Sequence, residues 1–128
     1  MASSLKKTNF EASNAIYENR IIDLVFLCAQ TMGDPKLEVE ILKLFDQTAS
    51  SSLKIILSEN GDNDKALKLH LHSLKGAAAG VGAKAIVKNI VLAEEDLRKN
   101  GSVKAQILAD IGFAVEEARR FIAKIISE

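Results

Sequence analysis

This chain of 128 residues has a formal net charge of zero and contains few aromatic residues, one proline and one cysteine. Tryptophan is absent, aromatic side chains make up 5% of the sequence, and proline, the strongest helix breaker, occurs once. Ala, Leu, Ile, Lys and Glu are frequent, so the composition predicts helix. The single Cys28 cannot form an intramolecular disulfide, and in its apolar stretch we expect a buried thiol.

Neither sign of charge predominates, because 17 Lys and Arg residues balance 17 Asp and Glu residues. Nucleic-acid-binding proteins normally carry net positive charge, since neutralising phosphates supplies much of their affinity, so this class is disfavoured. Long hydrophobic runs are also missing. Asp23 interrupts the best one, and no apolar segment of a secretory signal follows Lys6 and Lys7. We therefore expect a cytoplasmic protein without a membrane segment.

The chain divides into a polar N-terminal part and one helical domain. Residues 1–20 are weakly periodic and are predicted to form a mobile arm or a loose helix. Residues 21–128 show helical periodicity almost throughout and are long enough to bury a core of their own. We expect a single domain over this range.

Helix boundaries are marked by capping and turn residues. The first, short helix is predicted to stop at Met32-Gly33, and Asp34 followed by Pro35 is a strong start signal for the second. The other predicted boundaries are an N-cap at Asp62, a corner at Gly80-Val81-Gly82, a C-terminal stop at Gly101 and an N-cap at Ser102.

Each of these helices has an apolar stripe that we expect to face inward. The stripes are Ile22, Val25, Phe26 and Ala29; Leu42, Phe45, Ala49, Leu53 and Ile56; Leu67, Leu71, Leu74 and Ala78; Ile86, Ile90, Ala93 and Leu97; and Leu108, Ile111, Val115, Ala118, Ile122 and Ile125. Sustained alternation of polar and apolar residues is missing, so no sheet is predicted. The expected fold is all-α: an antiparallel up-down four-helix bundle with a short extra N-terminal helix across one end.

The third of these helices carries a histidine on its expected outer face. At about 100° per residue, His72 points about 140° away from the inward leucine stripe. Lys68, Lys75 and Ala79 lie on the same outer flank, and Gly76 lies beside His72 one turn further on. An exposed imidazole with an ordinary pKa of about 6.5 is neutral often enough near pH 7 to act as a nucleophile.

Gly76 is unusual because a glycine inside a helix costs about 1 kcal/mol relative to alanine. Close packing between helices would explain an inward glycine, but this one faces out. We infer that an external partner approaches the backbone beside His72. Lys75 is close enough for its ammonium to meet an anion on the imidazole, and phosphoryl transfer needs mainly positioning and neutralisation of charge.

The pattern His72-x-x-Lys75-Gly76, followed by small residues and Gly82-Ala83, resembles the signature of histidine-containing phosphotransfer (HPt) domains. The resemblance extends over most of the chain, from about Ile21 to Ile125. In the next helix, the positions that the family uses for its core and for an acidic–basic pair are occupied by Ile86, Ile90, Ala93, Glu94 and Arg98.

The resemblance implies a phosphorelay intermediate without ATP-dependent kinase activity of its own. His72 would accept a phosphoryl group from a phospho-aspartate on the receiver domain of a hybrid sensor kinase, and would pass it to the receiver domain of a response regulator. Lys75 would stabilise the phosphoryl charge. No cofactor is implied for this chain, because the receiver supplies magnesium. The residues implied in partner docking are Lys68, Leu69, Gly76 and Ala79. We expect a monomer, since one apolar stripe per helix suffices for a single bundle.

Plainer interpretations apply to the residues around His72. His70 lies about 60° from the core stripe, which favours a partly buried structural role. His70 and His72 diverge by about 200°, whereas helical metal pairs use spacings of three or four, so no metal site is predicted. The lysines on the outer flank form either a solvated face or a docking surface. Gly80 and Gly82 are predicted turn residues, with Gly82 setting the start of the next helix.

Three other functions compete with the relay. A helical bundle that regulates a partner by binding alone would keep the fold but would not accept phosphoryl groups on His72. A histidine-dependent hydrolase or transferase would need a concave pocket and a second acid–base group near His72, and the sequence places none on that face. A kinase dimerisation domain would have an acidic residue directly after the histidine and a nearby proline, whereas this chain has Ser73 and no such proline.

Overall fold

The computed structural model describes residues 21–58 and 64–127, and this part of the chain contains helices and no strand. The prediction of an all-α protein is therefore confirmed. The predicted arm at 1–20 and the predicted cap at Asp62 lie outside the described residues. The helices are α2 (Leu24–Thr31), α3 (Pro35–Ser58), α4 (Asp64–Gly80), α5 (Lys84–Asn100) and α6 (Ala105–Ser127).

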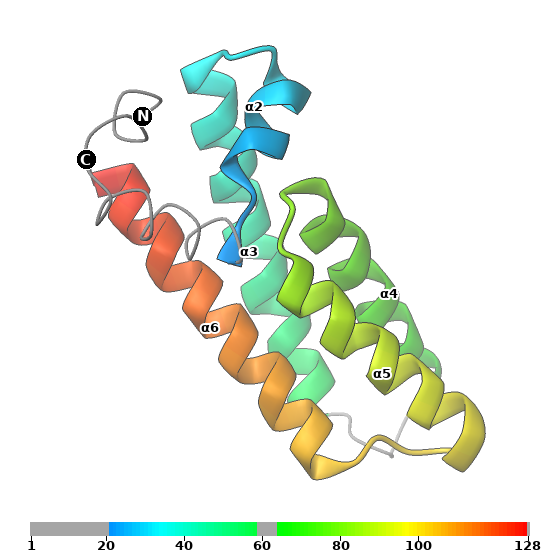
Figure 1. The fold of residues 1–128 in the computed structure, drawn as a ribbon. Coiled ribbons are helices and arrows are strands. Elements are labelled where there is room, and N and C mark those ends of the chain that lie inside the picture. The colour runs from blue at the N-terminus through cyan, green and yellow to red at the C-terminus, as the bar shows by residue number, and fades with distance from the viewer. Residues whose placement is uncertain (1–20, 59–63, 128) are drawn as a thin grey trace, which may run out of the picture.

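The four long helices lie side by side, and consecutive ones run in opposite directions (Figure 1). α3 packs against α4 and α6, and α5 also packs against α4 and α6, while the short α2 packs against α3. These contacts are compatible with the predicted bundle.

Most of the core comes from the apolar stripes predicted for α3 to α6. Every predicted inward residue of α3, α4 and α5 is buried, and on α6 the stripe is buried from Leu108 to Ile122, with Ile125 half-buried. Burial of apolar area is the main favourable term in folding. The spacing of three and four that repeats along each stripe therefore sets the rotation of each helix about its own axis.

The predicted start of α3 and the predicted stop of α5 are confirmed. Asp34 Oδ1 accepts hydrogen bonds from the backbone N–H groups of Lys36 (3.0 Å) and Leu37 (3.3 Å), which satisfies donors that the first helical turn leaves unpaired. At the end of α5, Gly101 has a φ of 76°, and its N–H donates to the Leu97 carbonyl over 2.9 Å.

The inner face predicted for the first helix was right at Ile22, which is buried, and wrong at the positions that lie in α2. Val25 is 61% exposed and Phe26 37% exposed, whereas Leu27 and Thr31 are buried. The residues from Leu24 to Ala29 are all apolar, so their pattern contains no polar face that could fix the rotation of the helix. The expectation for Cys28 was also wrong, because its side chain is exposed.

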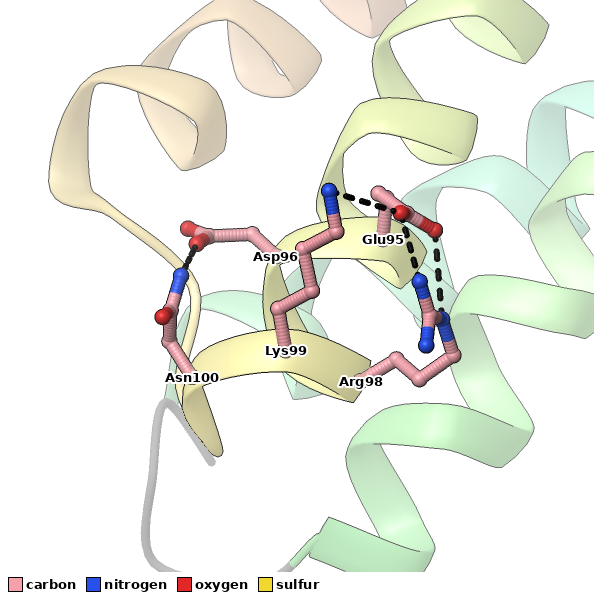
Figure 2. Close-up of polar contacts among 5 residues, drawn as sticks. All are labelled: Glu95, Asp96, Arg98, Lys99 and Asn100. Atoms are coloured by element: carbon pink, nitrogen blue, oxygen red, sulfur yellow. Dashed lines mark hydrogen bonds and ion pairs between the residues drawn. The ribbon is translucent and has the colours of Figure 1, made fainter.

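The predicted N-cap at Ser102 was wrong as well, since α6 begins at Ala105. The connection before it is held by Asp96 of α5, whose carboxylate accepts from the Lys104 backbone N–H (2.8 Å) and from Asn100 Nδ2 (2.6 Å), the latter shown in Figure 2. Val103 in the same connection is buried. These contacts hold the chain in a loop past Ser102.

Candidate functional site

His72 lies on the exposed surface of α4, as the sequence predicts. Leu71, the residue before His72, is 0% exposed, and so is Leu74, two residues after His72. The two leucines anchor this turn of α4 in the core, and the helical rotation then directs His72 outward. The imidazole is therefore accessible from solvent.

Gly76 is exposed one turn after His72, and a Cβ added there would meet nothing within 4 Å. The position therefore has room for a side chain, and neither neighbouring helices nor a positive φ requires glycine. No contact inside the described molecule explains this glycine. Its effect is a stretch of bare backbone next to the imidazole.

Lys75 lies one turn after His72 and makes an ion pair that the sequence did not indicate. Its Nζ donates to Glu94 Oε1 over 2.6 Å, and the two side chains are 31% and 30% exposed. Glu94 belongs to α5, so this pair connects the two helices beside His72. The cation that we expected to meet an anion on His72 is therefore already bound to a carboxylate.

The acidic–basic pair expected on α5, Glu94 with Arg98, was wrong in its acidic residue. Arg98 is paired with Glu95, at 2.7 Å from Nη2 to Oε1, and Lys99 approaches the same carboxylate at 3.2 Å (Figure 2). Hydrogen bonds from Arg98 and then Lys99 hold the pKa of the Glu95 carboxyl below its ordinary value. Glu94 is left to pair across the helices with Lys75.

The other residues expected to contact a partner are all on the surface of α4. Lys68, Leu69 and Ala79 are exposed, and Leu69 retains 63% of its area. Within the described ranges, Lys68 has no ion pair, in contrast to Lys75. An apolar side chain and a cation are thus available to a partner on the same helix as His72.

The corner between α4 and α5 needs glycine at one of its two predicted positions. Gly80 is the last residue of α4, and a Cβ there would meet nothing within 4 Å. Gly82 has a φ of 71°, and a Cβ there would lie 2.6 Å from the Cβ of Asp23. The turn and the close approach of the chain before α2 both depend on Gly82.

Asp23 connects this corner to α2 through three contacts. Its Oδ1 caps α2 by accepting from the Phe26 N–H at 3.0 Å, and its own N–H donates to the Gly82 carbonyl at 3.2 Å. Its Oδ2 lies 3.6 Å from Lys84 Nζ at the start of α5. In the sequence, Asp23 was interpreted only as an interruption of an apolar run.

His70 is half-buried, which agrees with the partial burial predicted for it. Its Nδ1 is buried without a hydrogen-bond partner among the described residues. His70 lies on the opposite flank of α4 from Lys75, toward α3. The two histidines therefore do not share a surface.

A surface hollow lies on the described part of the chain, at the start of α3 and away from His72. It has a volume of about 380 Å³, is lined by Pro35, Lys36, Val39 and Glu40, and includes neither histidine. In residues 21–58 and 64–127, no group of three His, Cys, Asp or Glu residues is arranged to hold a metal ion. Every helix in the same ranges is too short or too polar to span a lipid bilayer.

The angular positions of Lys75 and Glu94 on their own helices could have indicated that they pair. Each residue lies about 70° from the inward stripe of its own helix, and side chains at this angle reach a packed neighbour. The sequence did not tell us which flank of α4 faces α5, because that depends on how the helices are arranged.

Comparisons with known proteins leave the family of this chain open: no family model, curated protein or solved structure matches it.

Proposed function

We propose that this chain is a histidine-containing phosphotransfer protein. It accepts a phosphoryl group on His72 from the phospho-aspartate of one receiver domain and passes it to an aspartate of another. In this proposal, α3 to α6 form an antiparallel four-helix bundle that carries the histidine, and α2 covers one end. The protein acts in the cytoplasm between a hybrid sensor kinase and a response regulator.

The observation that carries the proposal is the exposed imidazole of His72 beside the open backbone of Gly76. A receiver holds its phospho-aspartate in a recess, so the accepting ring must protrude and its surroundings must be small. An exposed glycine with free space around it satisfies this requirement and has no structural use in the described molecule. Small Ala79 on the same face of α4 also leaves room for a partner.

The transfer requires one bond exchange. A neutral ring nitrogen of His72 attacks the phosphorus, a nitrogen–phosphorus bond forms, and the phosphorus–oxygen bond to aspartate breaks. The electron pair leaves with the aspartate as a carboxylate, and the proton on the other ring nitrogen is lost to water because the ring is exposed. The receiver's magnesium and the ammonium of Lys75 neutralise charge on the transferred group.

The decisive experiment compares the two histidines of the chain. A receiver domain from the same organism, carrying a radiolabelled phosphoryl group, is incubated with wild type, with His72→Gln and with His70→Gln as the matched control. We expect wild type and His70→Gln to become labelled and His72→Gln to remain unlabelled. Thermal unfolding should show that His72→Gln is within about 0.5 kcal/mol of wild type, because the replaced side chain is exposed.

Label on His72→Gln equal to that on wild type would overturn the proposal. A wild-type protein that binds receivers but takes no label would also overturn it and would favour the bundle that acts by binding alone.

A further inference from the structure

Lys75 has two possible anionic partners, and only one is present when His72 carries no phosphoryl group. Glu94 Oε1 lies 2.6 Å from Lys75 Nζ, and each side chain is about one-third exposed, at 30% and 31%. The ion pair is thus partly shielded from water and bridges α5 to the helix that carries His72. The other cation on this flank of α5, Arg98, is bound to Glu95 and does not compete for Glu94.

A phosphoryl group on His72 would change this competition. It carries a charge between about −1.5 and −2 near neutral pH, with three oxygens that accept strong hydrogen bonds. Residues at i and i+3 on a helix are neighbours, so the Lys75 ammonium is within reach of such a group. The carboxylate of Glu94 then competes with the phosphoryl oxygens for the same ammonium.

We propose that Glu94 is a positioning residue that holds the Lys75 ammonium in the unphosphorylated protein and gives it up to the phosphoryl group on His72. The inference rests on the phosphoryl-carrying role proposed for His72. By competing for the cation, Glu94 limits how strongly the phosphorylated state is stabilised. A carrier needs such a limit, because a phosphoryl group held too tightly is not passed on.

The test measures how readily the phosphoryl group on His72 loses a proton, which depends on the charges beside it. The full chain is phosphorylated with phosphoramidate, which transfers its phosphoryl group to a histidine nitrogen and leaves as ammonia. The ³¹P chemical shift is then followed against pH to obtain the acid dissociation constant of the phosphoryl group, and His72→Gln identifies the signal of His72. A freed ammonium favours the dianion, so Glu94→Gln should increase this constant about threefold, the size expected for a partly exposed ion pair.

Two further variants separate competition for Lys75 from a simple change of charge. Glu116→Gln removes the same charge from α6, where the carboxylate lies 3.4 Å from Arg119, and should leave the constant within about 1.5-fold of wild type. In a Lys75→Gln background, Glu94→Gln should have less than half of its effect in wild type. Such a loss of additivity is the mark of two residues that act through one contact.

The outcomes distinguish this inference from the proposed function. An equal effect of Glu94→Gln with and without Lys75, or no effect in either background, would overturn the role of Glu94 even if receivers label His72 normally. If receivers fail to label His72 while the phosphoramidate experiment gives the expected pattern, the relay proposal fails and the competition for Lys75 stands.

Discussion

At the scale of single residues, α4 has a fully buried side chain directly before an exposed one. Leu71 is 0% exposed, and the next residue, His72, is on the surface. One step along a helix rotates the side chain by about 100°, which carries the chain from the core to solvent. Substitutions on this face should therefore leave the stability of the fold nearly unchanged, so they test the proposed function directly.

Gly76 offers such a test. Replacing it with leucine should add helix propensity, worth up to about 1 kcal/mol of unfolding free energy, because a side chain there meets nothing within 4 Å. The same bulk beside His72 should weaken receiver binding at least tenfold, as measured by titration with a receiver domain. Gly112→Leu on α6 is the matched control, because a Cβ there also has open space.

If Gly76→Leu binds a receiver as tightly as wild type does, the backbone at Gly76 is not part of the docking surface. A loss of affinity of the same size in Gly112→Leu would point to a general effect of the added side chain.

At the scale of the elements, the corner between α4 and α5 is tied to the start of α2. Val81 is buried inside this corner, and the Gly82 carbonyl accepts from the Asp23 N–H. The corner follows His72 by little more than two helical turns, so it fixes where α5 and its Glu94 lie relative to α4.

Gly82→Ala should lower the free energy of unfolding by about 1–3 kcal/mol, because alanine disfavours a positive φ and its Cβ would lie 2.6 Å from the Asp23 Cβ. Gly80→Ala, two residues earlier and in open space, should leave stability unchanged or raise it by up to about 1 kcal/mol. Urea unfolding of the two variants measures both values. Equal unfolding midpoints would contradict the requirement for glycine at position 82.

At the scale of the whole molecule, polar contacts join distant helices and hold the connection between two consecutive ones. Arg119 of α6 donates to Asp46 of α3 at 2.9 Å, across 73 residues. Asp96 holds the connection from α5 to α6 through Asn100 and the backbone of Lys104. These contacts add specificity to helix positions that apolar burial leaves partly free.

Asp96 should make the stability of the whole molecule depend on acid. Hydrogen bonds from Asn100 and then from the Lys104 backbone hold the pKa of its carboxyl below the ordinary value of 3.8. The stabilisation is therefore fully present above about pH 4 and is lost as the pH falls through the folded-state pKa. Asp96→Asn should be less stable than wild type at pH 7, and the difference should shrink below pH 4 in urea unfolding.

Asp110→Asn, which removes a carboxylate from the exposed face of α6, controls for the change of net charge. A stability difference for Asp96→Asn that stays constant from pH 7 to pH 2.5 would contradict the role of its carboxylate.

The amino-acid sequence alone determined that α3 to α6 are helices, the apolar stripes that they bury and the exposure of His72 and Gly76, but not the start of α6 at Ala105. These features follow from local rules, because an apolar stripe with spacings of three and four has one inward direction. Where the stripe was missing, the sequence failed: the apolar run from Leu24 to Ala29 gave no direction, and the rotation of α2 and the exposure of Cys28 were predicted wrongly.

Only the tertiary structure decided which polar groups of different helices meet. Glu94 could pair with Arg98 on its own helix or with Lys75 on another, and the packing of α4 against α5 selected Lys75. Asp23 gained two of its three partners, Gly82 and Lys84, because the α4–α5 corner lies against it, which no local pattern encodes. Ion pairs between helices depend on distances of a few ångströms that are set by the packing of the whole core, so short-range patterns in the sequence do not specify them.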